Sequence, residues 1–239
     1  MPRQPRKYLP GFPTHVVQRG VNREPCFFGD QDRAHYLRSL AMACDEYRIA
    51  LHAYVLMSNH VHLLMTPEDT MGISRALQSL GSRYVQFVNR RIGRTGTLWE
   101  DRHHGTVVDT DRYLLTCYRY VELNPVRAHL TDRPEDHLWS SYRSNGCGEI
   151  DPLLTPHETY LGLGATPAER LKRYRALFEE ALPVREVNAL RTATHYGTPF
   201  GSVEFCRRID AELGTHASTD EEVVTVGPGN HRSSRSHCE

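Results

Sequence analysis

The pattern of hydrophobic and polar residues divides the first 145 residues into short apolar runs and longer amphipathic stretches. Short apolar or alternating runs predict β-strands at residues 14–19, 49–57, 60–66 and 106–108. Apolar residues at three- and four-residue intervals predict helices at residues 31–48, 71–94 and 112–123. Asp30 and Asp111 are the expected N-caps of the first and third helices. The turn at Ser58-Asn59 predicts that its two flanking strands pair antiparallel.

The last third of the chain follows a different pattern. Residues 152–167 are a connection rich in Pro, Gly and Thr, and three helices are then predicted at residues 167–182, 187–196 and 201–213, the first of them capped by Thr166. The remaining residues are polar and predict a disordered tail. We therefore expect a domain over residues 1–145, a helical extension over 150–213 that either recognises a ligand or supports the core, and a disordered tail over 214–239.

Composition narrows the classes of protein that fit. No apolar run approaches the roughly 20 residues that span a bilayer, and the basic N-terminus leads into Pro10-Gly11 rather than a signal core, so we expect a cytoplasmic protein without a membrane partner. The six cysteines are scattered without a C-x-x-C pair, which argues against a structural zinc site and disulfides. The net charge is zero, but residues 1–143 carry 19 basic against 15 acidic residues, a balance that suits a phosphate-bearing partner.

Two histidines stand one residue apart in the predicted strand at residues 60–66. Successive side chains of a strand point to opposite faces, so His60 and His62 share one face. Two adjacent imidazoles can bind one divalent metal ion. Because the chain holds 14 histidines, the pair alone is equally consistent with two polar residues on a solvated strand face. His103 and His104 are expected to be surface histidines without a role.

The predicted helix at residues 71–94 has an unusual polar face. An apolar stripe faces one way, whereas the other side combines small polar residues with arginines, and no acidic residue occurs between Asp69 and Glu100. Solvated helix faces usually mix both signs of charge. This face therefore favours binding to a nucleic-acid backbone over simple solvation, through Arg75, Arg83, Arg90, Arg91 and Arg94.

The predicted helix at residues 112–123 presents a candidate nucleophile. Tyr120 lies at the edge of its apolar stripe, and Asn124, four residues later, shares its side of the helix. Tyr118 lies within the stripe and is expected in the core, as are Trp139 and Tyr142 beyond the helix. A tyrosine hydroxyl ordinarily has a pKa of about 10 and attacks a phosphate only where the phosphate charge is neutralised, for example by a metal ion. A metal pair, a basic helix and a tyrosine thus indicate phosphoryl transfer on nucleic acid.

Several linked motifs resemble the HUH single-tyrosine transposases, and among them the REP-associated tyrosine transposases. The matching segments are PG at residues 10–11, HVVQRG at 15–20, YVLMSNHVHLL at 54–64, RYVELNPVRA at 119–128 and WSSY at 139–142. Their order and spacing agree with the family over about residues 1–145. Two features depart from it: His129 stands where the family often has Gly, and the extension at 150–213 is longer than the minimal fold.

The resemblance implies a fold, a site and an activity. The implied fold class is α+β, a ferredoxin-like antiparallel sheet with helices, followed here by the helical extension. The implied metal ligands for Mg²⁺ or Mn²⁺ are His60, His62 and the amide Asn124, and the implied nucleophile is Tyr120, with Arg19 among the DNA-binding residues. Such an enzyme cleaves and rejoins hairpin-bearing single-stranded DNA through a 5′-phosphotyrosine, in a cytoplasmic, nucleoid-associated setting, as a monomer or homodimer. The alternatives are a domesticated hairpin-binding protein that only nicks or binds, and a relative acting on RNA.

Overall fold

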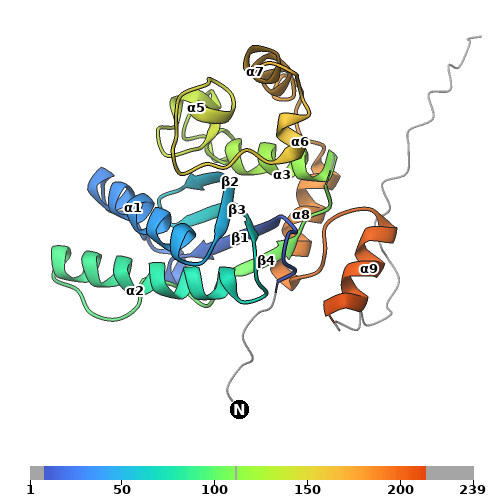
Figure 1. Cartoon of the computed structure of the whole chain (residues 1–239). Coiled ribbons are helices and arrows are strands. Elements are labelled where there is room, and N and C mark those ends of the chain that lie inside the picture. Colours follow the sequence, from blue (N-terminus) through green and yellow to red (C-terminus); the bar gives the residue numbers. More distant parts are fainter. Residues whose placement is uncertain (1–7, 111, 214–239) are drawn as a thin grey trace, which may run out of the picture.

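The first half of the chain forms a four-stranded antiparallel sheet with helices on both faces (Figure 1). The computed structural model describes residues 8–110 and 112–213. The strands are β1 (Thr14–Arg19), β2 (Ile49–Leu56), β3 (His60–Pro67) and β4 (His104–Val107), in the order β2-β3-β1-β4. Helices α1 (Asp30–Glu46) and α2 (Gly72–Ile92) cover one face, and α3 (Arg112–Glu122) packs on the other (Figure 1). All seven predicted elements of this half are present within a few residues of their predicted bounds.

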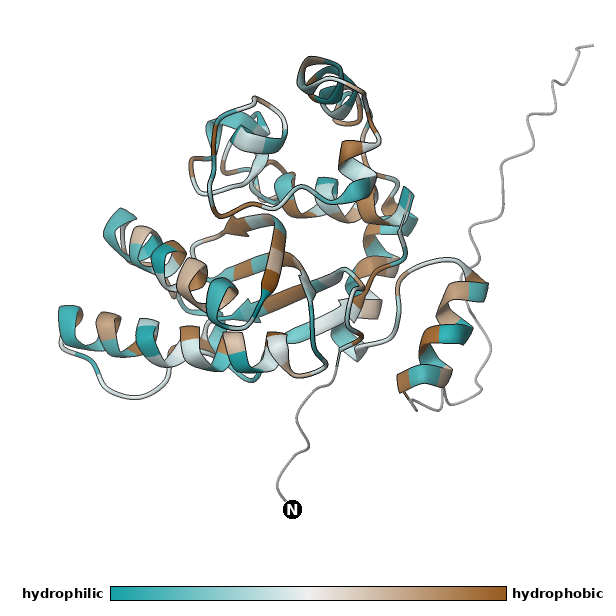
Figure 2. Ribbon diagram, in the orientation of Figure 1, coloured by the Kyte–Doolittle hydropathy of each residue, from teal (hydrophilic) through white to brown (hydrophobic). Residues whose placement is uncertain are grey.

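The alternation of side chains along β3 sorts residues between two cores. Val61, Leu63 and Met65 are fully buried against α1 and α2. Leu64 belongs to the second core, with α3. His60 and His62 lie four and two residues before Leu64 on the same strand, so they also face α3. Figure 2 shows hydrophobic residues concentrated on the strands, while the helices alternate hydrophilic and hydrophobic turns. The predicted pairing of the H-x-H strand thus places both imidazoles on the α3 side of the sheet.

Shorter elements connect and extend this frame. They are the 3-10 helices η1 (Val21–Arg23) and η2 (Pro134–Asp136), and the helices α4 (Asn124–Arg127), α5 (Tyr142–Asn145), α6 (Glu158–Leu161), α7 (Pro167–Ala176), α8 (Val184–Tyr196) and α9 (Val203–Leu213). Thr166 caps α7 as predicted, in a reciprocal capping box with Glu169. The first N-cap prediction was wrong, because Gly29 precedes α1 and Asp30 is its first residue. The second, at Asp111, lies outside the described residues, as does the tail at 214–239 predicted to be disordered.

The helical extension shares a core with the sheet domain. Tyr174 of α7 and Leu190 of α8 are fully buried in the same cluster as Leu64 and Tyr118. Helix α8 also contacts β1 and β4. Where the chain divides into domains stays a prediction, but α7 and α8 pack onto the α3 face of the sheet. Leu153 and Leu154 pack against the opposite core, and α9 packs with Val107 of β4. Within the described residues, no helix has both the length and the apolar character needed to cross a membrane.

Candidate active site

A cleft of about 710 Å³ opens on the α3 side of the sheet, where β1, β3, α3, α4 and α8 meet. It contains the predicted H-x-H pair, the predicted tyrosine and the predicted amide. Its other walls combine basic and polar side chains from distant parts of the sequence with one acidic residue, Glu100. The residues that line it include His15, Arg19, Arg23, His60, His62, Tyr120, Asn124, Arg127, Arg191 and Thr194.

His15 joins the H-x-H pair from the neighbouring strand. In the β1–β3 ladder His15 lies opposite Leu64, so it is the diagonal neighbour of His62 on the same face. The His15 Nε2 and His62 Nδ1 atoms are 2.9 Å apart, and the two rings are nearly parallel, with an interplanar angle of 4°. On its other side, His15 Nδ1 lies 2.9 Å from the Thr194 hydroxyl of α8. Three side chains therefore form one buried hydrogen-bonded row.

Burial lowers the pKa of three histidines of the cleft, His15, His60 and His62. Burial lowers the pKa of His15 to about 3 and that of His62 well below its ordinary value. The pKa of His60 falls to about 4, mainly through burial and then through the charge of Arg19, against a hydrogen bond with Asn124 that raises it. The Asn59 side-chain oxygen lies 2.7 Å from His60 Nδ1. Neutral imidazoles keep a lone pair, so both members of the H-x-H pair can act as ligands near pH 7.

Tyr120 lies against the histidine row. Its ring meets those of His15 and His62 edge-on, at centroid distances of 5.6 and 5.5 Å, and the residue is only 5 % exposed. The Arg127 guanidinium is centred 4.4 Å from the Tyr120 ring centroid, within cation–π range. Arg127 Nη1 is buried and has no hydrogen-bond partner among the described residues, so this donor can serve an acceptor that enters the cleft.

The break between α3 and α4 brings Asn124 into the cleft. Helix α3 ends at Glu122, and Asn124 begins α4 with Pro125 behind it. A hydrogen bond with the Asn124 side chain raises the pKa of His60, so the amide lies beside the H-x-H pair. Helix α4 then ends before His129, whose φ is +54°, in the left-handed region that favours glycine. This conformation explains in physical terms why a glycine would suit the position where this chain carries histidine.

Glu122, between Tyr120 and Asn124, fixes the tyrosine helix from behind. Its carboxyl group is fully buried and accepts hydrogen bonds from the Ser141 hydroxyl (2.5 Å), the Tyr174 hydroxyl (2.5 Å) and the Asn145 amide (2.8 Å). Burial raises its pKa to about 7, against these hydrogen bonds, which lower it. One carboxyl group therefore joins α3 to α5 and α7, and the helical extension helps to hold the nucleophile candidate in place.

Comparison with known proteins agrees with this arrangement. Residues 10–124 match the family model described as "Transposase IS200 like". Over these residues the chain belongs to the IS200-like transposase family. This confirms the predicted family, and the matched region of the transposase contains His15, His60, His62, Tyr120 and Asn124. None of the curated protein sequences matches the chain.

Two solved structures are similar to the transposase. One is described as a REP-associated tyrosine transposase bound to a REP hairpin. It is 17% identical, with a TM-score of 0.52, over 66% of this chain and 93% of that one. Another, a Deinococcus radiodurans protein solved as a candidate transposase, is 17% identical with a TM-score of 0.35, over 56% of this chain and 97% of that one. At this identity the first likeness concerns the fold, and it confirms the predicted HUH-type α+β fold.

The predicted DNA-binding arginines of the transposase fall into two groups. Arg19 is exposed at the end of β1 and lines the cleft. The five arginines of α2 and its C-terminal loop lie on the opposite side of the sheet. The expected absence of acidic neighbours does not hold in three dimensions, because Arg75, Arg83 and Arg91 form ion pairs with Asp69 (3.9 Å), Glu46 (2.8 Å) and Asp32 (2.7 Å). Two of these acids, Asp32 and Glu46, lie on α1, far from the arginines in the sequence.

The donor set of the cleft fits a divalent ion with nitrogen and oxygen ligands. Among the residues that the structure describes, no three His, Cys, Asp or Glu side chains are placed to hold a metal ion. The candidate ligands of the transposase are therefore two neutral imidazoles, His60 and His62, and the side-chain amide of Asn124 that contacts His60. Imidazole and amide donors suit Mg²⁺ less than carboxylates do but are acceptable to Mn²⁺ and Mg²⁺ together with phosphate oxygens.

Sequence reasoning missed several residues of the cleft. His15 could have been found from the period-two pattern of β1, which puts it on the H-x-H face once the two strands are paired. Arg127 follows Asn124 by about one helical turn, so the helical spacing that pointed to Asn124 could also have pointed to Arg127. Arg191 and Thr194 had no local signal. The expectation for His103 was wrong, since only 7 % of it is exposed, and His104 lines the cleft.

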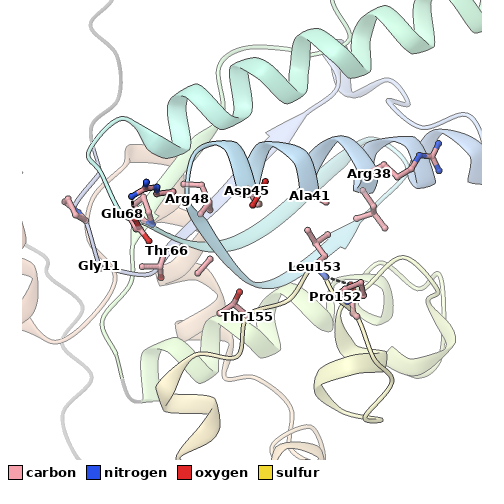
Figure 3. Close-up of a pocket in the computed structure, with 17 residues that line it drawn as sticks. Gly11, Arg38, Ala41, Asp45, Arg48, Thr66, Glu68, Pro152, Leu153 and Thr155 are labelled. Carbon is pink, nitrogen blue, oxygen red and sulfur yellow. Dashed lines mark hydrogen bonds and ion pairs between the residues drawn. The ribbon is translucent and has the colours of Figure 1, made fainter.

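A larger groove, of about 1180 Å³, lies away from the histidines beside α1 and β2 (Figure 3). Its charged side chains carry both signs, with Arg48 near Asp45 and Glu68 at one end and Arg38 at the other. Arg48 and Glu68 pair at 3.5 Å. The predicted histidines, tyrosine and amide line the smaller cleft and not this groove, so the smaller cleft is the candidate active site of the transposase.

Proposed function

We propose that this transposase cleaves and rejoins single-stranded DNA through a covalent link to Tyr120. The observation that carries the proposal is the position of Tyr120, edge-on to two buried neutral histidines and under the guanidinium of Arg127. A guanidinium beside the tyrosine can neutralise the charge of a phosphate that the tyrosine attacks.

The proposed reaction exchanges one phosphodiester for another. The Tyr120 hydroxyl oxygen attacks phosphorus, the bond from phosphorus to the 3′-oxygen breaks, and the phenolic proton is transferred overall to that leaving oxygen. The products are a 5′-phosphotyrosine and a free 3′-OH. In the reverse direction a 3′-OH attacks the phosphotyrosine and restores a phosphodiester. The covalent intermediate conserves the bond energy needed for rejoining.

Two sets of side chains support this chemistry. His60, His62 and Asn124 would hold Mg²⁺ or Mn²⁺, which when bound supplies Lewis-acid neutralisation of the phosphate charge. Arg127 would donate a hydrogen bond from Nη1 to a phosphate oxygen. Its guanidinium lies over the Tyr120 ring, so its positive charge supports the binding of a phosphate beside Tyr120.

The proposed DNA is a single strand that bears a hairpin. This rests on the fold shared with a transposase solved with a REP hairpin. Exposed Arg19, Arg23 and Arg191 surround the cleft and would contact the backbone of the single strand. The α2 arginines, on the other side of the sheet, are proposed as additional backbone contacts. Ion pairs with α1 reduce the charge that Arg83 and Arg91 offer.

The decisive experiment traps the covalent intermediate. We expect Tyr120→Phe to abolish the DNA-linked species on a hairpin-bearing single strand, in denaturing gels and by mass analysis of the linked peptide, while binding survives. Tyr113→Phe, on the same helix with its ring against Phe200, is the matched control and should retain the link. Undiminished trapping by Tyr120→Phe would refute the assignment.

The same assay separates the competing functions. A protein that only binds hairpins would give no cleavage with Mg²⁺ or Mn²⁺ and no change on chelation. A nicking enzyme would form the link but fail to rejoin an added 3′-OH strand. Competition between DNA and RNA strands of equal sequence tests the choice of nucleic acid.

A further inference from the structure

Helix α8 of the helical extension contributes a buried hydroxyl to the histidine row. Thr194 lies in the last turns of α8 and is 5 % exposed. It is separated from His15 by 179 positions, yet the two side chains are in hydrogen-bond contact at 2.9 Å. The packing of α8 on β1 and β4 creates this contact. The row therefore runs from the extension, through β1, to the H-x-H pair on β3.

The direction of the first hydrogen bond follows from the single proton of a hydroxyl. Thr194 Oγ1 donates to the Leu190 carbonyl at 2.8 Å, the i−4 bond common for threonine in helices. With its proton engaged, Thr194 can only accept from His15. His15 Nδ1 is therefore the protonated nitrogen of that ring.

The second hydrogen bond follows from the first. His15 is 1 % exposed, and its partners are a hydroxyl and another imidazole rather than an acid, so the ring is neutral and carries one proton. Its Nε2 is bare and must accept from His62 Nδ1, 2.9 Å away. The proton of neutral His62 is then on Nδ1, and Nε2 is the nitrogen that keeps a lone pair.

We infer that Thr194 and His15 are positioning residues that hold His62 in the tautomer whose Nε2 can bind a metal ion. The role of this tautomer in metal binding rests on the proposed function. The tautomer itself is a property of the metal-free protein. Partners of this kind orient a ligating imidazole and typically change metal affinity 10- to 100-fold. The helical extension would thus complete the active centre, beyond the two roles expected from the sequence.

The test reads the tautomers directly in the metal-free full-length chain. Long-range proton–nitrogen NMR on ¹⁵N-histidine protein distinguishes Nδ1–H from Nε2–H rings, with His15→Gln and His62→Gln variants for assignment. We expect both rings as Nδ1–H in the wild type. Thr194→Val removes the acceptor with little change of shape, so the Nε2–H form of His62 should become populated. Thr194→Ser keeps the hydroxyl and should retain the wild-type spectrum.

Metal titration gives a second readout. With Mn²⁺ alone as the probe, Thr194→Val should bind at least about 10-fold more weakly than the wild type, and Thr194→Ser should bind within about 2-fold. An Nε2–H ring at His62 in the wild type would overturn the inference, as would a Thr194→Val protein with unchanged tautomers and Mn²⁺ affinity. The wild-type spectrum decides the tautomer even if the valine variant fails to fold. Failure of all proteins to bind Mn²⁺ would instead count against the proposed metal site.

Discussion

Glu122 provides a stability prediction that also tests how the tyrosine helix is held. Because burial raises its pKa from 4.5 to about 7, the folded chain binds this proton more tightly than the unfolded chain does. Its contribution to stability is complete below about pH 4.5 and is lost as the pH rises through about 7. At about 1.4 kcal/mol per tenfold change in proton affinity, the shift corresponds to at most about 3.4 kcal/mol.

The environment of Glu122 supports this sign. Tyr118, Tyr160 and Tyr174 interact electrostatically with Glu122, and each of them has its own pKa raised, first of all by burial. In the described part of the chain, no cation is among the causes that shift the pKa of Glu122. Three hydrogen-bond donors oppose the shift without reversing it.

The perturbation is Glu122→Gln, which keeps the shape and cannot ionise. Its unfolding free energy, measured with urea from pH 4.5 to pH 8, should rise relative to the wild type by up to about 3 kcal/mol as the wild type loses its proton. Glu179→Gln, at an exposed carboxylate, is the matched control and should show no such trend. If the Gln variant instead loses stability relative to the wild type as the pH rises, the three donors hold an ionised carboxylate and the reasoning fails.

Two further predictions concern the charged residues around DNA. Arg127→Gln should lower formation of the DNA–tyrosine link by about 10²- to 10³-fold, the usual effect of losing one donor to a reacting phosphate or oxyanion, and should reduce hairpin binding far less. Arg143→Gln, at an arginine that pairs with Glu149, is the control. Equal losses of link formation and hairpin binding in Arg127→Gln would contradict the role. On α2, Arg90→Gln should lower the slope of log affinity against log salt by about 0.7, and Arg83→Gln should lower it less because Glu46 already pairs with it; unchanged slopes would exclude α2 from the DNA-binding surface.

Local pattern was sufficient for most of the fold. The alternation of β3 and the apolar stripes of α1, α2 and α3 reflect burial against one sheet, so their periods could be read directly. The ends of helices were less predictable. Asp30 has the residue type of an N-cap, yet Gly29 occupies that place, because any residue in extended conformation can precede a helix whose first turn already carries acidic side chains.

Charge was the least predictable property from sequence. An arginine face without acids nearby in the sequence predicted an uncompensated basic surface, but α1 packs beside α2 and supplies Asp32 and Glu46. The cleft shows the opposite case, where arginines scattered along the sequence at Arg19, Arg127 and Arg191 come together. Sequence patterns show only which charges are neighbours along the chain, whereas the packing of helices and strands decides which charges are close in space.

The helical extension shows why the candidate active site cannot be reduced to its motifs. The predicted histidines and tyrosine lie on β3 and α3, but the groups that set their state come from elsewhere. Thr194 of α8 reaches the histidine row, and Tyr174 of α7 donates to the carboxyl group behind Tyr120. A chain cut after residue 145 would therefore remove Thr194, the partner of His15 Nδ1, and Tyr174, one of the three donors to Glu122. We infer that the sheet domain alone would lose metal binding and stability together, even though it retains every residue of the matching motifs.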